Sequence, residues 1–368
     1  MKKQRVLMAM SGGVDSSLAA CLLKEQGYEV IGATIRNWTP PGWEELTADV
    51  GGCCSLSSVE DARRVAFQLE IPFYVLNFAE SFENEVVKPF AAAYLAGQTP
   101  NPCVLCNKTM RFGLLYHRAR ELEADFVATG HYARVHYREE RYHLLKGLDA
   151  KKDQSYMLYT ASQEALAMTL YPLGEYNKEQ TRQMARDRGL AVAGKADSQD
   201  VCFIPDGNIG GFLSSYLPGD YTGKIVYRDG QTLGLHSGYQ QYTIGQRKGL
   251  GIAWTDPLYV LDIDAASKNV IVGEKEFLYS KVLLADELNW IAFQALKEPM
   301  QAEAKIRYAA KPVAVLIKPC SDGNCRVEFS EEQRSITPGQ AIVFYRGDEV
   351  LGGGRISQII RNEERESL

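Results

Sequence analysis

The chain has 368 residues, of which 45% are hydrophobic and 24% charged, and its formal net charge is -5. This length predicts two or three domains, and the negative charge argues against a protein that grips nucleic acid with its whole surface, although a local basic patch remains possible. No apolar run approaches the roughly 18 to 20 residues that span a bilayer. Eight cysteines in a chain this long are not the dense disulfide framework of a small secreted domain. We therefore expect a cytoplasmic protein whose cysteines are thiols, metal ligands or catalytic groups.

The first half of the chain alternates strand-like and helix-like segments. Strands are predicted at residues 5–10, 29–35, 73–78 and 126–129, and helices at residues 16–26, 58–69, 82–95 and 111–122. Such β-α alternation is typical of a doubly wound parallel α/β sheet, in which ligands bind at the carboxyl ends of the strands.

The second half of the chain changes character twice. Helical segments follow Thr160, and one of them, at 178–188, is expected to stop at Gly189. Beyond Gly207 short strands separated by turns are predicted, at residues 259–263, 270–272, 303–306, 313–317, 325–329 and 341–345. We therefore predict an α/β domain with a helical extension over residues 1–206, a small β-rich linker domain over 207–278, a C-terminal β-barrel over 279–360 and a tail over 361–368.

The segment MSGGVDSS, residues 10–17, lies between the first predicted strand and the first predicted helix. Its glycines let backbone N–H groups approach an anion, and the helix N-terminus adds partial positive charge. No lysine follows the glycines, so this is not a G-x-x-x-x-G-K-[ST] loop. Asp15 beside phosphates makes sense if it holds Mg²⁺. The alternative is a Gly-Gly turn that merely caps a helix.

The SGGxDS pattern resembles the pyrophosphate loop (PP-loop) of the N-type ATP pyrophosphatases. These enzymes split ATP into AMP and pyrophosphate and activate an oxygen by adenylation. The resemblance implies ATP as a cofactor but leaves the substrate open, since the superfamily includes small-molecule synthetases as well as tRNA thiolases.

Two cysteine segments are candidates for the chemistry. In NPCVLCNK, Cys106 precedes a predicted helix and two nearby cations, Lys108 and Arg111, and such surroundings lower the pKa of a thiol. Cys202, in DSQDVCF, lies where the helical segments give way to strands, and a loop cysteine can move toward an active site. Either cysteine could instead be an inert buried residue.

The remaining cysteines are weaker candidates. Cys320 and Cys325 could complete a zinc site with Cys103 and Cys106, but the residues between them favour a hairpin turn. Cys21, Cys53 and Cys54 are interpreted as structural.

Several motifs in order resemble those of one family, the bacterial tRNA-specific 2-thiouridylases (the MnmA family) of the PP-loop superfamily. They are SGGVDSS, NPxxxCNK, ATGHY at 128–132, KDQSY at 152–156, DSQDxCF at 197–203 and YTIGQRKGLG at 242–251. The resemblance covers nearly the whole chain. It implies an adenine nucleotide alpha hydrolase-like α/β domain followed by the linker domain and a tRNA-binding barrel.

The resemblance also implies a reaction. ATP with Mg²⁺ adenylates O2 of the wobble uridine of a tRNA, and sulfur from a cysteine persulfide then displaces AMP to leave 2-thiouridine. By motif, Cys202 is the persulfide carrier and Cys106 the catalytic nucleophile, and a second thiol is needed to release sulfide or to resolve the adduct as a Cys106–Cys202 disulfide. The sulfur comes from a donor protein, either a cysteine desulfurase or a relay protein.

The binding residues implied by the resemblance form two sets. Those for ATP are Ala9, Met10, Ser11, Gly12, Gly13, Val14, Asp15, Ser16, Ile35 and Gly130. Those for tRNA are Asn101, Pro102, Cys103, His131, Lys152, Asp153, Gln154, Arg307, Tyr308 and Gln340. The first three of these would line the flipped uridine, since an enzyme that acts on a base must unstack it.

One position departs from the family. Better-known members carry aspartate where this chain has Cys103, so Cys103, Cys106 and Cys202 form a set of three thiols. Three thiolates resemble the ligands of the [4Fe-4S] centres in related tRNA thiolases. The alternatives are therefore a persulfide mechanism with Cys103 as a bystander, or a cluster. Rivals outside the family reading are a PP-loop enzyme acting on a small molecule and an RNA-binding or sulfur-carrier module without turnover.

Overall fold

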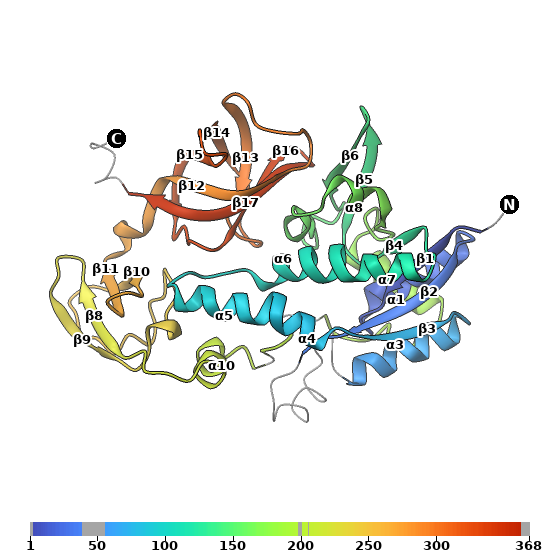
Figure 1. Cartoon of the computed structure of the whole chain (residues 1–368), viewed down its shortest axis with the longest axis horizontal. Coiled ribbons are helices and arrows are strands. Elements are labelled where there is room, and N and C mark those ends of the chain that lie inside the picture. Colours follow the sequence, from blue (N-terminus) through green and yellow to red (C-terminus); the bar gives the residue numbers. More distant parts are fainter. Residues whose placement is uncertain (1–2, 39–55, 198–200, 205, 362–368) are drawn as a thin grey trace. The chain divides into compact units, whose positions relative to one another are not determined.

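The computed structural model describes residues 3–38, 56–197, 201–204 and 206–361 (Figure 1). It divides into two compact units. The first unit comprises Met1–Val87, Pro102–Gly207 and Asp348–Leu351, and the second comprises Lys88–Asn101, Asn208–Gly347 and Gly352–Leu368. The segment Lys88–Asn101 thus packs with the second unit although it lies within the predicted first domain. The division into three domains stays a prediction.

A five-stranded parallel sheet forms the centre of the first unit. Its strand order is β3-β2-β1-β4-β7, with β1 at Arg5–Ala9, β2 at Glu29–Arg36, β3 at Phe73–Asn77, β4 at Phe126–Ala128 and β7 at Thr169–Leu170. Val6, Leu7 and Met8 of β1 are fully buried, as expected for a central strand of a sheet that is covered on both faces. The predicted parallel α/β class is confirmed.

The helices of the first unit are α1 (Val14–Glu25), α3 (Leu56–Gln68), α4 (Ala79–Phe82), α6 (Pro102–Cys106), α7 (Leu115–Glu121), α8 (Gln163–Met168) and α9 (Lys178–Asp187). Helices α1, α3 and α9 lie close to the predicted positions, whereas α6 was not predicted. The predicted helix at 82–95 is divided among the end of α4, a π-helical stretch at Glu83–Val87 and α5 (Lys88–Leu95). The predicted helix at 111–122 differs at its start, because a π-helical stretch at Asn107–Leu114 joins α6 to α7. Gly189, at φ +62°, follows α9 as predicted.

A hairpin of β5 (Ala133–Arg138) and β6 (Arg141–Lys146) was not predicted. Its two turn residues, Glu139 and Glu140, have φ of +50° and +57°. Hairpin turns of this kind usually carry Asn or Gly, so the sequence lacks the ordinary signal. Glu349, the first residue of β17 (Glu349–Ile360), pairs with Leu145 of this hairpin.

The second unit holds α5 (Lys88–Leu95), α10 (Ile209–Tyr216) and two β structures. The smaller sheet has the order β10-β11-β8-β9, with β8 at Gly223–Tyr227, β9 at Thr232–His236, β10 at Tyr259–Asp264 and β11 at Asn269–Gly273. The larger structure contains β12 (Tyr279–Trp290), β13 (Met300–Lys305), β14 (Val313–Pro319), β15 (Cys325–Arg334), β16 (Ala341–Arg346) and β17 (Glu349–Ile360).

Strands β12 to β17 form an antiparallel barrel that closes where β12 pairs with β17. The predicted barrel is therefore confirmed, although β12 and β17 were not predicted. Both strands carry register shifts, and β17 contains three consecutive glycines, Gly352, Gly353 and Gly354, which are atypical of strands. A Cβ on Gly352 would lie 2.3 Å from the Asn289 carbonyl oxygen, so the glycines allow the close approach of β12.

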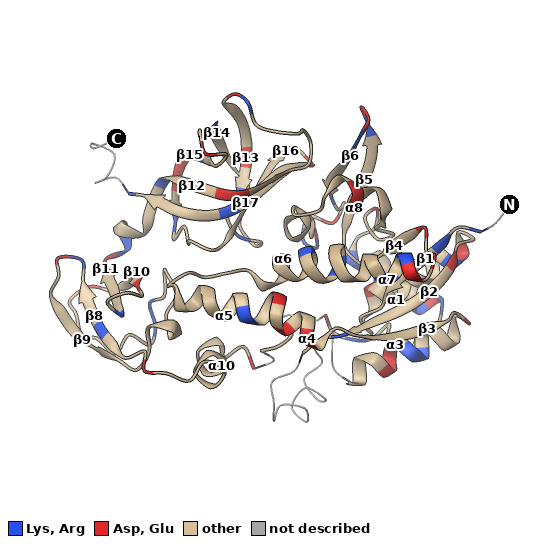
Figure 2. Cartoon of the chain, in the orientation of Figure 1, with Lys and Arg blue, Asp and Glu red and all other residues tan. Residues whose placement is uncertain are grey.

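Acidic and basic residues both occur on α3 and on α7 (Figure 2). Arg63 pairs with Glu60 on α3, and Arg118 pairs with Glu121 on α7. These helices therefore present surfaces on which opposite charges offset each other. Across the described residues, no helix is long and apolar enough to cross a membrane.

Candidate active site at the phosphate loop

The predicted phosphate loop lies at the carboxyl end of β1, where β1 gives way to α1. Its first residue is tied to the neighbouring strand: the Met10 amide donates to the Ala33 carbonyl at 2.8 Å, and the Thr34 hydroxyl donates to the Met10 carbonyl at 2.7 Å. Thr34 is buried. These bonds hold the loop at the edge of a parallel sheet where ligands usually bind.

Ser16 organises the inside of the loop. Its hydroxyl accepts from the Ser11 amide at 3.1 Å and lies 3.3 Å from the Gly13 carbonyl and 3.2 Å from the Ser11 hydroxyl. Gly13, which caps α1, has no side chain to bond the N–H groups of the first turn. Such a helix start is suited to an anion.

Two of the predicted ATP residues are glycines for a steric reason. Gly12 has φ of +70°, and a Cβ there would lie 2.1 Å from the Ser58 carbonyl oxygen. A Cβ on Gly130 would lie 2.7 Å from the Ser16 amide nitrogen. The loop is therefore enclosed by the first turns of α3 on one side and by the residues that follow β4 on the other.

Lys195 contacts both α3 and the phosphate loop. Its ammonium lies 2.8 Å from the Asp61 carboxylate on α3 and donates to the Gly12 carbonyl at 3.1 Å and to the Ser58 hydroxyl at 3.3 Å. One side chain thus joins α3 to the loop.

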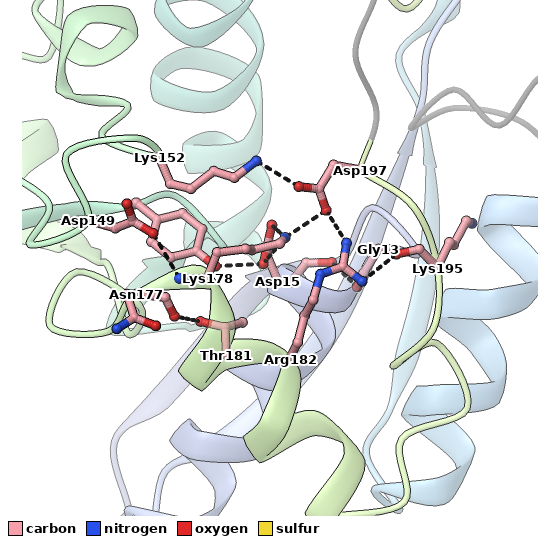
Figure 3. Close-up of polar contacts among 12 residues, drawn as sticks. Gly13, Asp15, Asp149, Lys152, Asn177, Lys178, Thr181, Arg182, Lys195 and Asp197 are labelled. Carbon is pink, nitrogen blue, oxygen red and sulfur yellow. Dashed lines mark hydrogen bonds and ion pairs between the residues drawn. The ribbon is translucent and has the colours of Figure 1, made fainter.

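A charged cluster adjoins the loop (Figure 3). Lys178 Nζ lies 2.8 Å from both carboxylate oxygens of Asp15, and the Tyr132 hydroxyl donates to Asp15 at 2.8 Å. The same Nζ lies 2.8 Å from Asp197. Asp197 also pairs with Arg182 and Lys152, each at 2.8 Å. Three cations thus surround two carboxylates.

The electrostatics of this cluster favour an ionised Asp197. Burial alone would raise its pKa, but the hydrogen bonds from Lys152 and Lys178 outweigh burial and lower the pKa to about 2. Asp197 therefore stays negatively charged across the physiological range.

The sequence reading did not include Lys178 or Arg182 among the site residues. One signal was available: Lys178 is the first residue of α9, where the helix dipole disfavours a cation. A lysine at that position indicates an acidic partner elsewhere in the fold.

The thiols predicted for catalysis lie on α6 and on the segment after α9. Cys106 ends α6 and is half-buried, whereas Cys103 in the same helix is exposed. Cys202 is half-buried. Phe203, its neighbour, is 2% exposed and packs edge-on against Phe82 with 5.8 Å between the ring centroids. Residues 198–200 and Pro205 of this motif lie outside the described residues.

His131 contacts Arg111, which lies five residues after Cys106, and Thr129, which precedes Gly130. Burial, and then the charge of Arg111, lower the pKa of His131 well below its usual value. Arg111 Nη1 lies 3.2 Å from His131 Nε2, and Thr129 Oγ1 lies 2.8 Å from His131 Nδ1. Because a guanidinium only donates, Nε2 accepts and Nδ1 carries the proton. Arg111 also donates to Asn107, the residue after Cys106, at 2.6 Å.

The three residues of the 152–154 turn, predicted to contact tRNA, differ in their surroundings. The Asp153 side chain is buried and accepts from the Gly147 amide at 3.2 Å and from the Ser155 amide and hydroxyl at 3.0 Å. Gln154 accepts from the Tyr132 amide at 3.1 Å. These contacts indicate that Asp153 and Gln154 shape the turn, and contact between tRNA and this turn stays a prediction.

Arg307, Tyr308 and Gln340, which are also predicted to contact tRNA, belong to the second unit. Gln340 Nε2 donates to the Thr99 carbonyl at 2.7 Å and so orders the chain two residues before Asn101. Arg307 donates to Thr337 at 3.2 Å, and the Lys305 ammonium lies 5.6 Å from the Tyr308 ring centroid. Their contact with tRNA is a prediction as well.

Two metal sites were predicted, an iron–sulfur cluster on three cysteines and a Mg²⁺ site at Asp15. Within the described residues, no three His, Cys, Asp or Glu side chains gather as metal ligands, and the iron–sulfur alternative for Cys103, Cys106 and Cys202 stays a prediction. Asp15 faces the Lys178 ammonium with both oxygens, which shows that its carboxylate suits a cation. A single carboxylate together with phosphate oxygens is an ordinary Mg²⁺ site.

The remaining cysteines agree with structural roles where the structure describes them. Cys21 and Cys325 are buried. Cys320 lies in the β14–β15 hairpin turn, where its amide donates to the Asn324 carbonyl at 2.9 Å, so the hairpin interpretation is confirmed. Cys53 and Cys54 lie outside the described residues.

Three family models match successive parts of the chain. They are described as a tRNA methyl transferase HUP domain at residues 4–206, a tRNA methyl transferase PRC-barrel domain at 210–274 and an aminomethyltransferase beta-barrel domain at 280–356. The first match alone covers the parallel sheet, the phosphate loop and both catalytic candidates.

Three relatives that match along nearly the whole chain are named tRNA-specific 2-thiouridylase MnmA. The chain is 49% identical to the protein of Clostridium botulinum (strain Alaska E43 / Type E3), with 98% of this chain and 99% of that protein covered. It is 50% identical to the protein of Geotalea uraniireducens (98% and 97% covered) and 51% identical to that of Heliobacterium modesticaldum (96% and 92%). The chain therefore belongs to the family of tRNA-specific 2-thiouridylases, MnmA.

Proposed function

We propose that this protein is an ATP-dependent tRNA 2-thiouridylase. It adenylates O2 of the wobble uridine and then replaces that oxygen with sulfur, releasing AMP and pyrophosphate. The observation that carries the proposal is the phosphate loop with Asp15 at the carboxyl end of β1, in a chain that also carries Cys106 and Cys202 within motifs that resemble those of the family.

The loop supports binding of ATP phosphates. The N–H groups at the start of α1 and the hydroxyls of Ser11 and Ser16 are donors for phosphate oxygens. Asp15 would hold Mg²⁺, which, when bound, neutralises charge on the departing pyrophosphate. Ile35, near the carboxyl end of β2, would pack on the adenine, and Gly130 leaves room for the nucleotide beside Ser16.

The thiols divide the sulfur transfer between them. A donor protein loads Cys202 as a persulfide. The Cys106 thiolate attacks the inner sulfur of that persulfide, which forms the Cys106–Cys202 disulfide and releases hydrosulfide. Hydrosulfide attacks C2 of the adenylated uridine, and the C2–O bond to AMP breaks. A thiol reductant returns both cysteines to thiols. Attack by the persulfide itself, with Cys106 resolving the adduct, gives the same products.

The remaining side chains would surround the uracil base. The neutral His131 places an acceptor toward Arg111 and a donor toward Thr129, so no extra positive charge develops beside the uracil. Cys103 is exposed on α6 and would line the base pocket with Asn101 and Pro102 without joining the transfer. We place the reaction in the cytoplasm, where these cysteines remain thiols.

The function is tested by a single assay with ATP, Mg²⁺, uridine-34 tRNA, and a cysteine desulfurase with cysteine as the sulfur source, scored by mercury-gel retardation. Wild-type protein should give retarded tRNA, and Cys106→Ser and Cys202→Ser should give none. Cys320→Ser, which alters a thiol of the barrel hairpin, is the matched control and should give wild-type product. Undiminished product from Cys202→Ser contradicts the persulfide mechanism, and pyrophosphate release without any need for tRNA would indicate a small-molecule enzyme.

The role of iron is tested separately. Protein reconstituted anaerobically with iron and sulfide should bind no stoichiometric iron and show no absorption band near ~400 nm, the region typical of iron–sulfur clusters. A stable band whose loss follows Cys103→Ser would favour the cluster alternative.

A further inference from the structure

The YTIGQRKGLG segment, residues 242–251, carries two cations that the proposed mechanism does not use. Arg247 and Lys248 are both exposed, and within the described part of the chain neither side chain pairs with a carboxylate. The segment itself contains no Asp or Glu. In a chain whose net charge is -5, these two adjacent residues form a local concentration of positive charge.

The backbone of this 242–251 loop is held in one shape. The Gln246 side chain accepts from the Thr243 amide at 3.1 Å and donates to the Lys248 carbonyl at 3.0 Å. The loop is also bonded to the neighbouring strand β10, because the Gly245 amide donates to the Val260 carbonyl at 2.8 Å. The two cations therefore extend from a pre-organised backbone, which reduces the conformational entropy that is lost when a ligand binds.

The loop lies against the residues that hold Arg307, which is predicted to contact tRNA. A Cβ on Gly245 would lie 2.5 Å from Ser335 Oγ. The Ser335 carbonyl accepts from the Arg307 guanidinium, and Thr337 Oγ1 accepts from the same guanidinium at 3.2 Å. Arg247 follows Gly245 by two residues, which span at most about 7 Å. Arg247 therefore lies near Arg307, and both belong to the second unit.

The segment that begins at Ser335 also contacts the chain that leads to the predicted uridine pocket. The Thr99 amide donates to the Pro338 carbonyl at 2.9 Å, and Gln340 Nε2 donates to the Thr99 carbonyl at 2.7 Å. Thr99 precedes Asn101 by two residues. Within the second unit, residues 335–340 thus connect the 242–251 loop to Arg307 and to the approach to Asn101.

The chemistry of the two exposed side chains fits a ligand that carries phosphates. A guanidinium offers a planar fork of donors to a phosphate, and an ammonium offers a compact charge. RNA carries a phosphate at every nucleotide, so one RNA backbone can contact both cations. Because the loop lies beside Arg307 and the approach to Asn101, its position favours the tRNA backbone as the ligand.

We propose that Arg247 and Lys248 bind phosphates of the tRNA backbone, and that residues 335–340 set the distance from these cations to the uridine pocket. The inference rests on the proposed function, since it takes tRNA as the substrate. It extends the tRNA-binding surface from the barrel to the predicted linker domain. Phosphate contacts of this kind position the tRNA without reading its sequence.

The test measures binding of tRNA to the full-length protein at several salt concentrations by fluorescence anisotropy. The probes are two labelled, unmodified transcripts, one with uridine and one with cytidine at the wobble position. Arg247→Gln and Lys248→Gln should each weaken the binding of both transcripts by about fivefold at about 0.1 M salt, because each lost phosphate contact lowers the slope of log affinity against log salt by about 0.7–0.9. The double variant should lower that slope by about 1.5.

Two further measurements separate tRNA binding from folding and from the chemical step. Thermal unfolding of the double variant, and its affinity for α,β-methylene-ATP with Mg²⁺, should equal those of wild-type protein, because the phosphate loop belongs to the first unit. In the thiolation assay the double variant should raise the KM for tRNA and leave kcat unchanged, as expected when an interaction made equally in the ground and transition states is lost.

Lys297→Gln is the matched control. Lys297 is an exposed lysine of the same unit. It lies in the connection between β12 and β13, whereas Arg307 follows the other end of β13. The substitution removes the same charge as Lys248→Gln, and it should leave the tRNA affinity and the salt slope at their wild-type values.

Two results would overturn the inference while leaving the function intact. One is a double variant that binds both transcripts with wild-type affinity and salt slope; if it also loses sulfur transfer from the desulfurase, the loop binds that protein instead. The other is a loss of affinity confined to the transcript with wobble uridine, which would indicate a contact with the base. Failure of wild-type protein to bind either transcript would instead contradict the proposed function, and the inference with it.

Discussion

Gly130 lies against Ser16 so closely that a Cβ added to Gly130 would come within 2.7 Å of the Ser16 amide nitrogen. The two residues are far apart in the sequence, one after β4 and the other in the first turn of α1. The contact between Gly130 and Ser16 encloses one side of the phosphate loop. It arises because β4 and β1 are paired in parallel, so the residues that follow the two strands lie at the same edge of the sheet.

The first prediction concerns this contact. Gly130→Ala should lower the affinity for Mg·ATP by about tenfold or more, because the added methyl group must displace the backbone that binds the phosphates, and overpacking of this kind typically costs about 1–3 kcal/mol. Gly194→Ala is the control, since a Cβ there meets nothing within 4 Å. Calorimetric titration with a non-hydrolysable analogue measures the effect. Equal affinities of the Gly130→Ala and Gly194→Ala variants for the analogue would show that the contact between Gly130 and Ser16 does not shape the nucleotide site.

The second prediction concerns Lys195. Lys195→Met and Asp61→Asn should each reduce the affinity for nucleotide by a few-fold. The first removes the ammonium that donates to the Gly12 carbonyl, and the second removes the carboxylate that holds this ammonium in place. Both partners are about a quarter exposed, 27% and 25%, so a coupling energy of about 0.5–1 kcal/mol is expected. The double variant should then be no weaker than either single variant.

The comparison for this pair is Arg63→Met. Arg63 lies on the same helix and pairs with Glu60 at the surface, so its removal should leave nucleotide affinity unchanged. Fully additive losses in the Lys195 and Asp61 variants would mean that the two residues act independently of each other.

The third prediction concerns pH. Burial, and then the charge of Arg111, lower the pKa of His131 in the folded protein, so its imidazole stays neutral there. In the unfolded chain the same imidazole takes up a proton near its ordinary pKa of about 6.5. The unfolded state then binds more protons, and the free energy of unfolding should fall as the pH drops below about 6.5. The stability that neutral His131 contributes is present above that pH.

Urea unfolding at several pH values checks this dependence. His131→Asn should flatten the decline between about pH 6.5 and pH 5, whereas His117→Asn, which removes an exposed imidazole from α7, should leave the slope as in wild type. A slope that is the same in all three proteins would show that His131 is not the group responsible.

Much of the fold was accessible from local patterns. The parallel sheet follows from β-α alternation, α9 ends just before Gly189 as a glycine stop predicts, and the Cys320–Cys325 segment forms its hairpin. Elements with atypical composition were missed. The β5–β6 turn uses Glu139 and Glu140 at positive φ, and β17 tolerates consecutive glycines because β12 packs closely on it.

By itself the sequence determined the family, the parallel α/β class and the identity of the loop and thiol residues, because these depend on residue types at short spacing. Only the tertiary structure decided that Lys178 faces Asp15 and Asp197, that Asp153 is buried, and that burial together with Arg111 keeps His131 neutral. Ion pairs and desolvation depend on distances of a few ångströms between segments far apart in the chain. No local spacing encodes those distances, and only the packed sheet and its helices set them.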